Sequence, residues 1–287
     1  ETSYECRAFC GEDFTASQEF ATEAEEQLPN AGFEAYSHAE SSVYYSWFDP
    51  SALSLYLQSK WWDSGNVGST TVGSAYCIAI PDTENKVEGS TSASLVSRNV
   101  VIKFAAGNTF SGEFAGLVGT QGGLVNFGRP WTLRPRAIRL WARYDCGSID
   151  VVDSYPTERP VKVGDPDMCS MMVALGDWDY RRFGGTPQCP VQVNTTDKST
   201  FFDPSTSSVI AYGSFTSDKS STWWEDCPEF VQDAGDGWVE LEIPLEYRAT
   251  DRRPTHIIVS FASSALGDYF TGSSQSRMWI DDIRLVY

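Results

Sequence analysis

The chain has 287 residues, of which 41% are hydrophobic and 14% aromatic, and this composition excludes a disordered chain. The formal net charge of −18 repels phosphate backbones and anionic headgroups, which disfavours nucleic acid as a partner but not neutral ligands such as sugars. No run of about 18 apolar residues occurs, so we expect no membrane-spanning segment.

The first 32 residues differ in composition from the rest and are predicted to be an acidic leader or linker. They begin at Glu1 without a methionine or an apolar signal region, which favours a processed or trimmed form of an exported protein. The segment 11–28 is rich in Glu and Ala, with apolar residues spaced six, four and four positions apart. This spacing suits a short amphipathic helix or a tether that ends at Pro29.

From Phe33 onward, short runs of β-branched and aromatic residues alternate with Gly, Pro, Ser and Asn breaks, which is typical of an all-β protein. One short helix is expected over residues 51–57. The strands are expected at residues 43–47, 74–80, 92–96, 100–104, 114–118, 137–144, 171–175, 208–212, 238–245, 254–261 and 278–287. Many short strands with polar turns predict a β-sandwich of jelly-roll type. Segments 145–167 and 181–201 are too long for hairpins, and we expect them to decorate one rim.

The seven cysteines are dispersed and include no CxxC pair, so a zinc site is not expected. Their odd number leaves at least one thiol free if the others pair, and the spacing does not assign any disulfide.

Several motifs, in order over residues 33–287, resemble the putative carbohydrate metabolism domain of surface and exported proteins in Bacteroides-type bacteria. The motifs are Phe33-Glu34, residues 61–66, 103–114, 128–135 with 141–144, 210–213, 243–248, 263–272, and Ile280-Asp281-Asp282. The resemblance implies a jelly-roll sandwich similar to carbohydrate-binding modules, which handles oligo- or polysaccharides at the cell surface, in the outer membrane or in the periplasm. It also implies other surface proteins of a glycan-utilisation system as partners. Seven cysteines depart from the usual pattern of this family.

Sugar recognition requires flat aromatic faces beside amides and carboxylates that pair with hydroxyl groups. Adjacent residues on a strand face opposite ways, so one member of Trp61-Trp62, or of Trp223-Trp224, could instead belong to the core. The residues predicted to bind a ligand are Trp61, Trp62, Asn66, Asn108, Asp177, Trp178, Asp268 and Tyr269.

No cofactor is required by the sequence, but sugar-binding jelly rolls often hold a structural calcium ion between their first and last strands. Glu34 and either Asp281 or Asp282 stand where its ligands would stand. One aspartate of the pair should point inward, where burial is costly unless the carboxylate meets a metal, an arginine or backbone amides. Asp165 and Asp167 form a weaker calcium candidate.

Glycoside hydrolysis would require two carboxylates about 5–10 Å apart across a cleft. Glu113 and Asp268 are the candidates, because both lie in the motifs that carry the resemblance. No nucleophile elbow, phosphate loop or zinc-protease motif occurs. We therefore favour a noncatalytic glycan-binding module, with a glycoside hydrolase as the alternative and a structural or adhesive surface domain as the second alternative.

Overall fold

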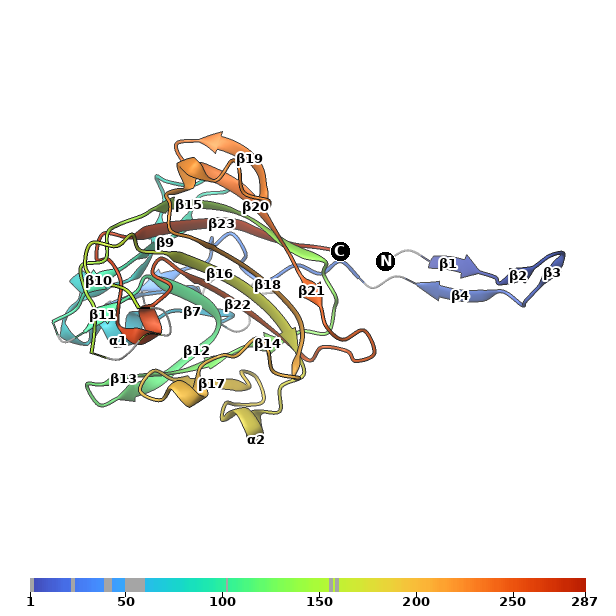
Figure 1. The fold of residues 1–287 in the computed structure, drawn as a ribbon, viewed down its shortest axis with the longest axis horizontal. Helices are drawn as coiled ribbons and strands as arrows, with labels where there is room; N and C mark the ends of the chain where they lie inside the picture. The colour runs from blue at the N-terminus through green and yellow to red at the C-terminus, as the bar shows by residue number, and fades with distance from the viewer. Residues whose placement is uncertain are drawn as a thin grey trace.

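The computed structural model describes residues 3–21, 24–38, 43–49, 60–101, 103–154, 157 and 160–287. Two antiparallel sheets pack face to face (Figure 1). The larger sheet has the spatial order β17 (Val191–Asn194), β13 (Gly122–Phe127), β12 (Asn108–Val118), β22 (His256–Ala262), β16 (Cys169–Gly176), β18 (Val209–Ser217) and β21 (Glu246–Tyr247), with β14 (Arg129–Pro130) on β22 and β7 (Trp62–Asp63) on β12. The smaller sheet has the order β19 (Phe230–Gly235), β20 (Trp238–Pro244), β15 (Ala137–Asp145), β23 (Arg277–Val286), β9 (Ser92–Val96) and β8 (Ala79–Asp82).

Short elements complete the described chain. Two further strand pairs are β5 (Ser37–His38) with β6 (Tyr45–Ser46), and β10 (Arg98–Asn99) with β11 (Phe104–Ala105). The helical turns are α1 (Asn66–Ser69), η2 (Thr70–Val72), η3 (Ser74–Tyr76), α2 (Tyr180–Phe183), η4 (Lys198–Thr200), η5 (Ser221–Trp223) and η6 (Gly267–Tyr269).

The core follows from strand alternation. On β16, Met171, Val173 and Leu175 are fully buried and belong to the main hydrophobic cluster between the sheets. In the neighbouring strand β22, Val259 lies opposite Val173 and turns to the same side. Because side chains alternate along a strand, the intervening residues face outward, and they form the outer surface of the larger sheet.

The predicted all-β jelly-roll sandwich is confirmed. The strand expected at residues 92–96 has the same bounds as β9, and those near residues 137, 171 and 278 match long strands of the two sheets. The strand expected at 74–80 is wrong in its first half, because Ser74–Tyr76 forms the turn η3 after Gly73, whose φ of 141° interrupts the chain. The helix expected over residues 51–57 lies outside the described residues.

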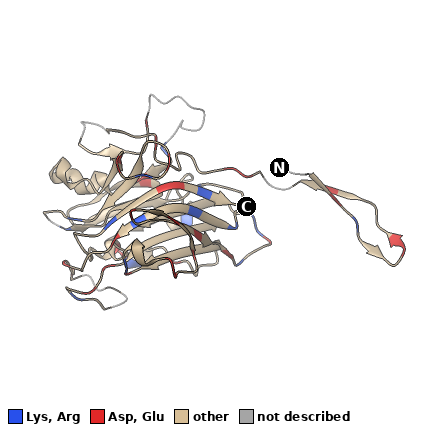
Figure 2. Cartoon of the chain, turned by 90° about the horizontal axis from the view of Figure 1, so that it is seen from above, with Lys and Arg blue, Asp and Glu red and all other residues tan. Residues whose placement is uncertain are grey.

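The amphipathic helix expected over residues 11–28 is wrong. The segment forms a hairpin in which β1 (Ser3–Cys6) pairs with β4 (Gln18–Ala21), and β2 (Phe9–Cys10) pairs with β3 (Asp13–Phe14). The hairpin extends away from the sandwich in two perpendicular views (Figures 1 and 2). Its aromatic pairs form across the strands, as between Tyr4 and Phe20, and therefore lie in solvent rather than on a core.

The sandwich itself begins before residue 33. The side chain of Gln27 both donates to and accepts from the backbone of Leu285, at 2.9 and 2.7 Å. The backbone N–H of Ile283 donates to the carbonyl oxygen of Ala31 at 3.1 Å, and Leu28 is buried. Residues 27–31 therefore run along the last strand and belong structurally to the sandwich, not to the leader.

All seven cysteines are free thiols. Burial raises the pKa of Cys189 to about 11, so this thiol remains protonated at neutral pH. No helix among the described residues is both long enough and apolar enough to cross a membrane.

Candidate functional site

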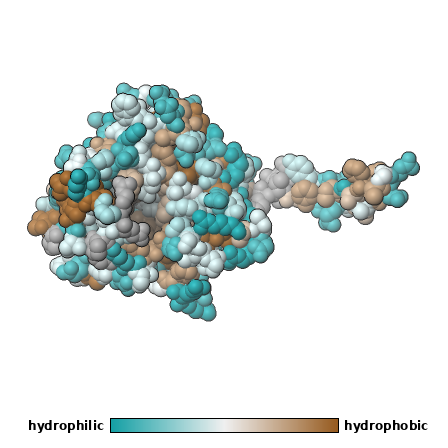
Figure 3. Space-filling model, in the orientation of Figure 1, coloured by the Kyte–Doolittle hydropathy of each residue, from teal (hydrophilic) through white to brown (hydrophobic). Residues whose placement is uncertain are grey.

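The outer surface of the larger sheet is hollow, and we call it the hollow face. The sheet bows so that this side is concave, and the surface of the molecule is hollowed here (Figures 1 and 3). Met172 lies opposite Ser214 on one side and Ser260 on the other, and all three face outward. The floor of the hollow face consists of Ser170, Met172, Tyr212, Ser214, Thr216, Ser260 and Ala262, each half-buried or exposed.

One rim of the hollow face is built by the chain between β16 and β18. Gly176 ends β16, and a Cβ atom there would lie 2.6 Å from the ring of Trp178, so glycine allows the indole to fold back over the sheet. Trp178 is buried with Ile258 and packs edge-on against Phe202, with ring centroids 6.1 Å apart. The insert expected to decorate a rim at residues 181–201 thus packs over this end of the sheet and also supplies its edge strand β17. Phe202, which follows it, shares a hydrophobic cluster with the floor residues Met172 and Tyr212, and both remain half-buried.

The opposite rim is the loop that follows β22. Tyr269 of η6 meets Phe201 of the insert with ring centroids 5.3 Å apart, and Lys198 lies 4.8 Å from the centre of the tyrosine ring. Phe270 follows with a left-handed backbone, φ 53°, and Lys103 lies 4.5 Å from the centre of its ring. Aromatic faces and cationic side chains therefore gather where the insert approaches this loop.

The outer surface of the smaller sheet is closed, and we call it the sealed face. Its outward side chains include Trp141, Trp238 and Trp279, which form a cluster with Val87 and are each at most 8% exposed. Arg143 stacks over Trp279 at 4.6 Å. The chain from residue 83 to residue 91, called here the covering loop, crosses this face.

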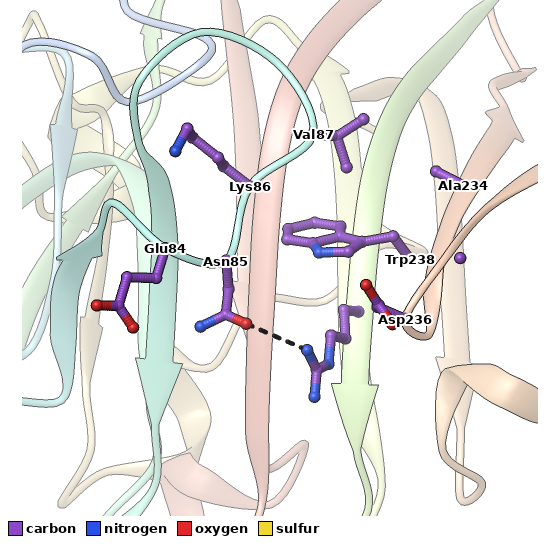
Figure 4. A pocket seen from close by; sticks show the side chains of 9 residues that line it. Glu84, Asn85, Lys86, Val87, Ala234, Asp236 and Trp238 are labelled. Atoms are coloured by element: carbon purple, nitrogen blue, oxygen red, sulfur yellow. Dashed lines mark hydrogen bonds between the residues drawn. The ribbon is translucent and has the colours of Figure 1, made fainter.

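A small polar pocket lies beside the covering loop (Figure 4). Its volume is about 240 Å³, and the Trp238 ring forms part of its wall. Arg143 donates to Asn85 Oδ1 at 3.3 Å inside it. The lining residues are Glu84, Asn85, Lys86, Val87, Arg143, Ala234, Gly235, Asp236 and Trp238. None of them belongs to the set predicted from sequence.

The structure buries side chains of the ligand site that was predicted at residues 61–66. Trp62 has no exposed surface and packs against Phe33 and Phe261. Asn66 is 1% exposed, donates to the carbonyl oxygens of Tyr45 and Ala79, and accepts from two backbone amides. These side chains hold the turn before β8 and cannot reach a polysaccharide.

Trp61 and Asn108 also have internal roles. Trp61 is half-buried and packs edge-on against Trp131, with ring centroids 6.1 Å apart. Asn108 accepts from the backbone of Gly65 at 2.9 Å and donates to the carbonyl of Ala106. Neither residue is part of the floor of the hollow face.

The remaining predicted ligand residues divide between the two rims. Asp177 pairs with Arg252 at 2.7 Å, and Trp178 is buried beneath the insert. Tyr269 and the exposed Asp268 lie on the opposite rim, in η6. In the other tryptophan pair, Trp223 is 71% exposed and Trp224 is buried; the pair lies at the end of the turn η5 and not in a strand.

The two proposed catalytic carboxylates do not come together. A Cβ atom on Gly267 would lie 2.5 Å from Ala106, so η6, which holds Asp268, packs beside the start of β12. Glu113 lies five residues beyond Asn108 on that strand, about 16 Å away at the usual rise per residue. It accepts from Asn126 at 3.0 Å and lies on the face opposite to the outward-facing Phe127. The structure thus offers no cleft between these two acids.

A buried carboxylate that the sequence treated as a weak calcium candidate is saturated by hydrogen bonds. Asp167 Oδ2 accepts from Ser276 Oγ at 2.7 Å, from Ser273 N at 2.9 Å and from Ser264 Oγ, while Oδ1 accepts from Met168 N. Burial raises the pKa of Asp167 despite these four donors. The group joins the loop after β22 to the residues just before the start of β23. The serine run Ser273–Ser276 was the signal for this network, and sequence reasoning did not use it.

The predicted metal residues do lie near each other, and one aspartate of the pair is buried, as alternation along the strand predicted. Asp281 is fully buried, whereas Asp282 is half-buried and pairs with Arg284 at the surface. Burial raises the pKa of Asp281, as expected for a carboxylate removed from water. Glu34 accepts hydrogen bonds from the covering loop at Ser90 and Thr91.

A family model described as "Putative carbohydrate metabolism domain" matches residues 32–286. The chain is also similar to two solved structures described as putative glycoside hydrolases. The first, from Bacteroides thetaiotaomicron VPI-5482, has 17% identity and a TM-score of 0.60, with 94% of this chain and 75% of that chain covered. The second, from Bacteroides vulgatus ATCC 8482, has 16% identity and a TM-score of 0.56, with 89% of this chain and 96% of that chain covered. At these identities the structures show a shared fold, and no curated protein sequence matches the chain.

Proposed function

Because the chain belongs to the putative carbohydrate metabolism domain family, we propose that its hollow face binds a neutral oligo- or polysaccharide without cleaving it. The observation that carries the proposal is the open floor of this face. Tyr212 supplies an aromatic ring. Ser214 and Thr216 of β18 and Ser260 of β22 supply hydroxyl groups on either side of β16. This combination suits the apolar C–H side and the hydroxyl edge of a pyranose ring.

The charges of the protein support a neutral ligand. The formal net charge of −18 opposes polyanions in general, while the seven floor residues carry no ionisable side chain other than the tyrosine hydroxyl. Lys198 and Arg248 lie over Tyr269 and Tyr212, so the cations near the site are directed toward aromatic rings. A chain of neutral sugars would meet no buried charge here.

The extent of the floor supports a chain of sugars as the ligand rather than a single sugar. The floor residues extend across β22, β16 and β18, three neighbouring strands with a spacing of roughly 4.8 Å. The rims at Trp178 and η6 stand at its two ends. A linear oligosaccharide lying along the hollow would contact Tyr212 and the hydroxyl groups together.

Binding and hydrolysis are separated by one set of measurements. The protein is incubated with a panel of soluble neutral polysaccharides, and both affinity electrophoresis and release of reducing ends are followed. The proposal predicts retarded migration with at least one polysaccharide and no reducing ends. Released sugar would favour the hydrolase, and an Asp268→Asn variant that stops the release would identify a catalytic acid.

Variants then locate the site. Tyr212→Ala removes the floor ring, whereas Trp223→Ala removes an exposed ring outside the hollow face and serves as the matched control. Lost binding in Tyr212→Ala with retained binding in Trp223→Ala supports the hollow face. The reverse pattern would transfer the site to η5 and overturn this assignment.

The proposal also includes export, with the protein meeting its polysaccharide at the cell surface or in the periplasm beside other glycan-handling proteins. The support for this part is the family resemblance. Fractionation of cells that express the full-length protein tests it, because recovery of the protein in the cytoplasmic fraction alone would contradict it.

A further inference from the structure

We infer that a divalent cation of the calcium class binds between the last strand, the covering loop and the turn around Gly32, held by Asp281, Glu34 and Thr91. The site lies on the smaller sheet and not on the hollow face, so it can succeed or fail independently of glycan binding.

The local backbone places Asp281 inside the protein. Arg139 of β15 lies opposite Arg284, but Trp141 lies opposite Asp281, so β23 has an extra residue at this point. Asp282 takes the left-handed conformation that such a bulge requires, with φ 44°. The bulge changes the direction of the strand and turns the Asp281 side chain beneath the covering loop, where it has no exposed surface.

The carboxylate of Asp281 is only half satisfied. Oδ2 accepts from the backbone N–H groups of Val87 and Glu88, at 2.8 and 3.0 Å. Oδ1 is buried and makes no hydrogen bond of ordinary geometry among the described residues, although the backbone N–H of the adjacent Asp282 also interacts with the carboxylate. No lysine or arginine within the described ranges forms an ion pair with it. An ionised oxygen in this state is costly to bury, so it requires a further partner.

A second orphan atom lies in the same region. Thr91 is 1% exposed, and its Oγ1 also has no partner within the described part of the chain. Its own backbone N–H donates to Glu34 Oε1 at 3.3 Å, which joins the threonine to the second carboxylate. Both buried oxygens belong to residues near Glu34, whose exposed carboxylate also accepts from the backbone N–H of Ser90. Such oxygens fit a cation better than a hydrophobic contact.

Two glycines bring the acids together. A Cβ atom on Gly32 would lie 3.9 Å from both Glu34 Oε1 and Asp281 Oδ1, so both oxygens face the space beside this glycine. Gly89 has φ 58°, and a Cβ atom there would lie 2.0 Å from Glu34 Oε1. Only glycine at position 89 allows the Glu34 carboxylate to approach the covering loop this closely.

The donor set determines the class of cation. Two carboxylates and a hydroxyl are hard oxygen ligands, which Ca²⁺ prefers and completes with backbone carbonyl groups and water. None of the three donors is a nitrogen or sulfur atom, which disfavours a transition metal. Within the described ranges no three acidic, histidine or cysteine side chains gather, so the cation would rely on two carboxylates and on neutral oxygens. When bound, the cation would supply positive charge to Asp281 Oδ1 and connect three segments far apart in sequence.

Calcium-dependent melting tests the inference. Protein stripped with EDTA is melted with excess EDTA, with 2 mM MgCl₂ or with 2 mM CaCl₂, and calcium binding is measured by calorimetry. We expect calcium to raise Tm by roughly 5 °C or more, the shift for a site well above saturation in a chain of this size. Equal Tm in EDTA and CaCl₂, with no binding heat, would overturn the inference.

Matched variants identify the ligands. Asp281→Asn keeps the shape of the side chain but removes its charge, and the expected result is loss of the calcium-induced rise in Tm. Asp282→Asn alters the neighbouring surface aspartate and should retain the full rise. Should Asp281→Asn fail to fold, Thr91→Val provides the second test, with a calcium affinity expected to fall at least threefold. An unchanged calcium response in Asp281→Asn would contradict the assignment. If Asp281→Asn does not fold, an unchanged calcium affinity in Thr91→Val would contradict it.

Discussion

The two outer faces of the sandwich both carry aromatic residues but differ in access to solvent. On the sealed face, three tryptophans are almost fully buried under the covering loop. On the hollow face, Tyr212 and its serine and threonine neighbours stay half-buried or exposed between two rims. Aromatic content therefore does not locate a glycan site in this fold. The loops that cover a sheet decide which aromatic rings a sugar can reach.

Removing one aromatic ring from each face tests most strongly whether the two faces differ in packing. Trp279→Ala should lower the free energy of unfolding by about 4 kcal/mol, because it leaves a cavity among Trp141, Trp238 and Val87. Tyr212→Ala should cost clearly less, since its ring is only partly buried. Urea unfolding of both variants measures the difference. Equal losses would mean that the hollow face is also a packed core.

The same two substitutions should affect glycan affinity in the opposite order, with the larger loss in Tyr212→Ala. Tyr212→Ala should weaken binding roughly tenfold or more, corresponding to about 1.4 kcal/mol of lost contact. Trp279→Ala, in the fraction that remains folded, should keep the wild-type affinity. Titration of each variant with the polysaccharide bound by the wild type gives both dissociation constants, and a selective loss in Trp279→Ala would move the site to the sealed face.

Ion pairs on the sealed face should make a smaller, pH-dependent contribution to the free energy of unfolding. Hydrogen bonds from Arg139, together with the nearby Arg136, lower the pKa of Glu242 below its usual value of 4.5. A folded-state pKa below the unfolded one stabilises the protein above that usual value, and the stabilisation is lost as pH falls through the folded pKa. Glu242→Gln should therefore cost about 0.5–1 kcal/mol at pH 7 and less near pH 3. Unfolding curves at the two pH values check the sign, which a constant difference would contradict.

Deleting the hairpin should have the smallest effect. Each residue of β1, β2, β3 and β4 is exposed, and the aromatic rings pair within the hairpin instead of packing on the sandwich. A chain starting at residue 24 should therefore melt within about 1 °C of the full chain. A larger decrease would show that the leader stabilises the sandwich through contacts of its own.

The sequence predicted the sandwich well because strand signals are local. The residue runs at 171–175 and 278–287 predicted strands, and both lie in long strands of the two sheets. Alternation in the last strand also predicted that one of its two adjacent aspartates would be buried, and the structure shows that it is Asp281. The leader was misassigned because its apolar spacing is compatible with a helix, whereas the hairpin depends on cross-strand aromatic pairs around Gly11.

The candidate site could not be predicted in the same way. Trp62 and Asn66 have the composition of a sugar site, but their burial depends on Phe33, Phe261 and the backbone near residue 79, which are distant in sequence. Tyr212 was not singled out because a single tyrosine in a strand gives no sign of whether a neighbouring loop will cover it. Access to a sheet depends on the conformation of the long inserts, and residue patterns do not encode that conformation directly.

The most direct test of the central claim is the binding of Tyr212→Ala and Trp223→Ala to the neutral polysaccharide that retards the wild-type protein. We expect Tyr212→Ala to lose at least tenfold in affinity and Trp223→Ala to bind like the wild type. Equal affinities for wild type and Tyr212→Ala would contradict it, as would a wild-type protein that binds no polysaccharide in the panel.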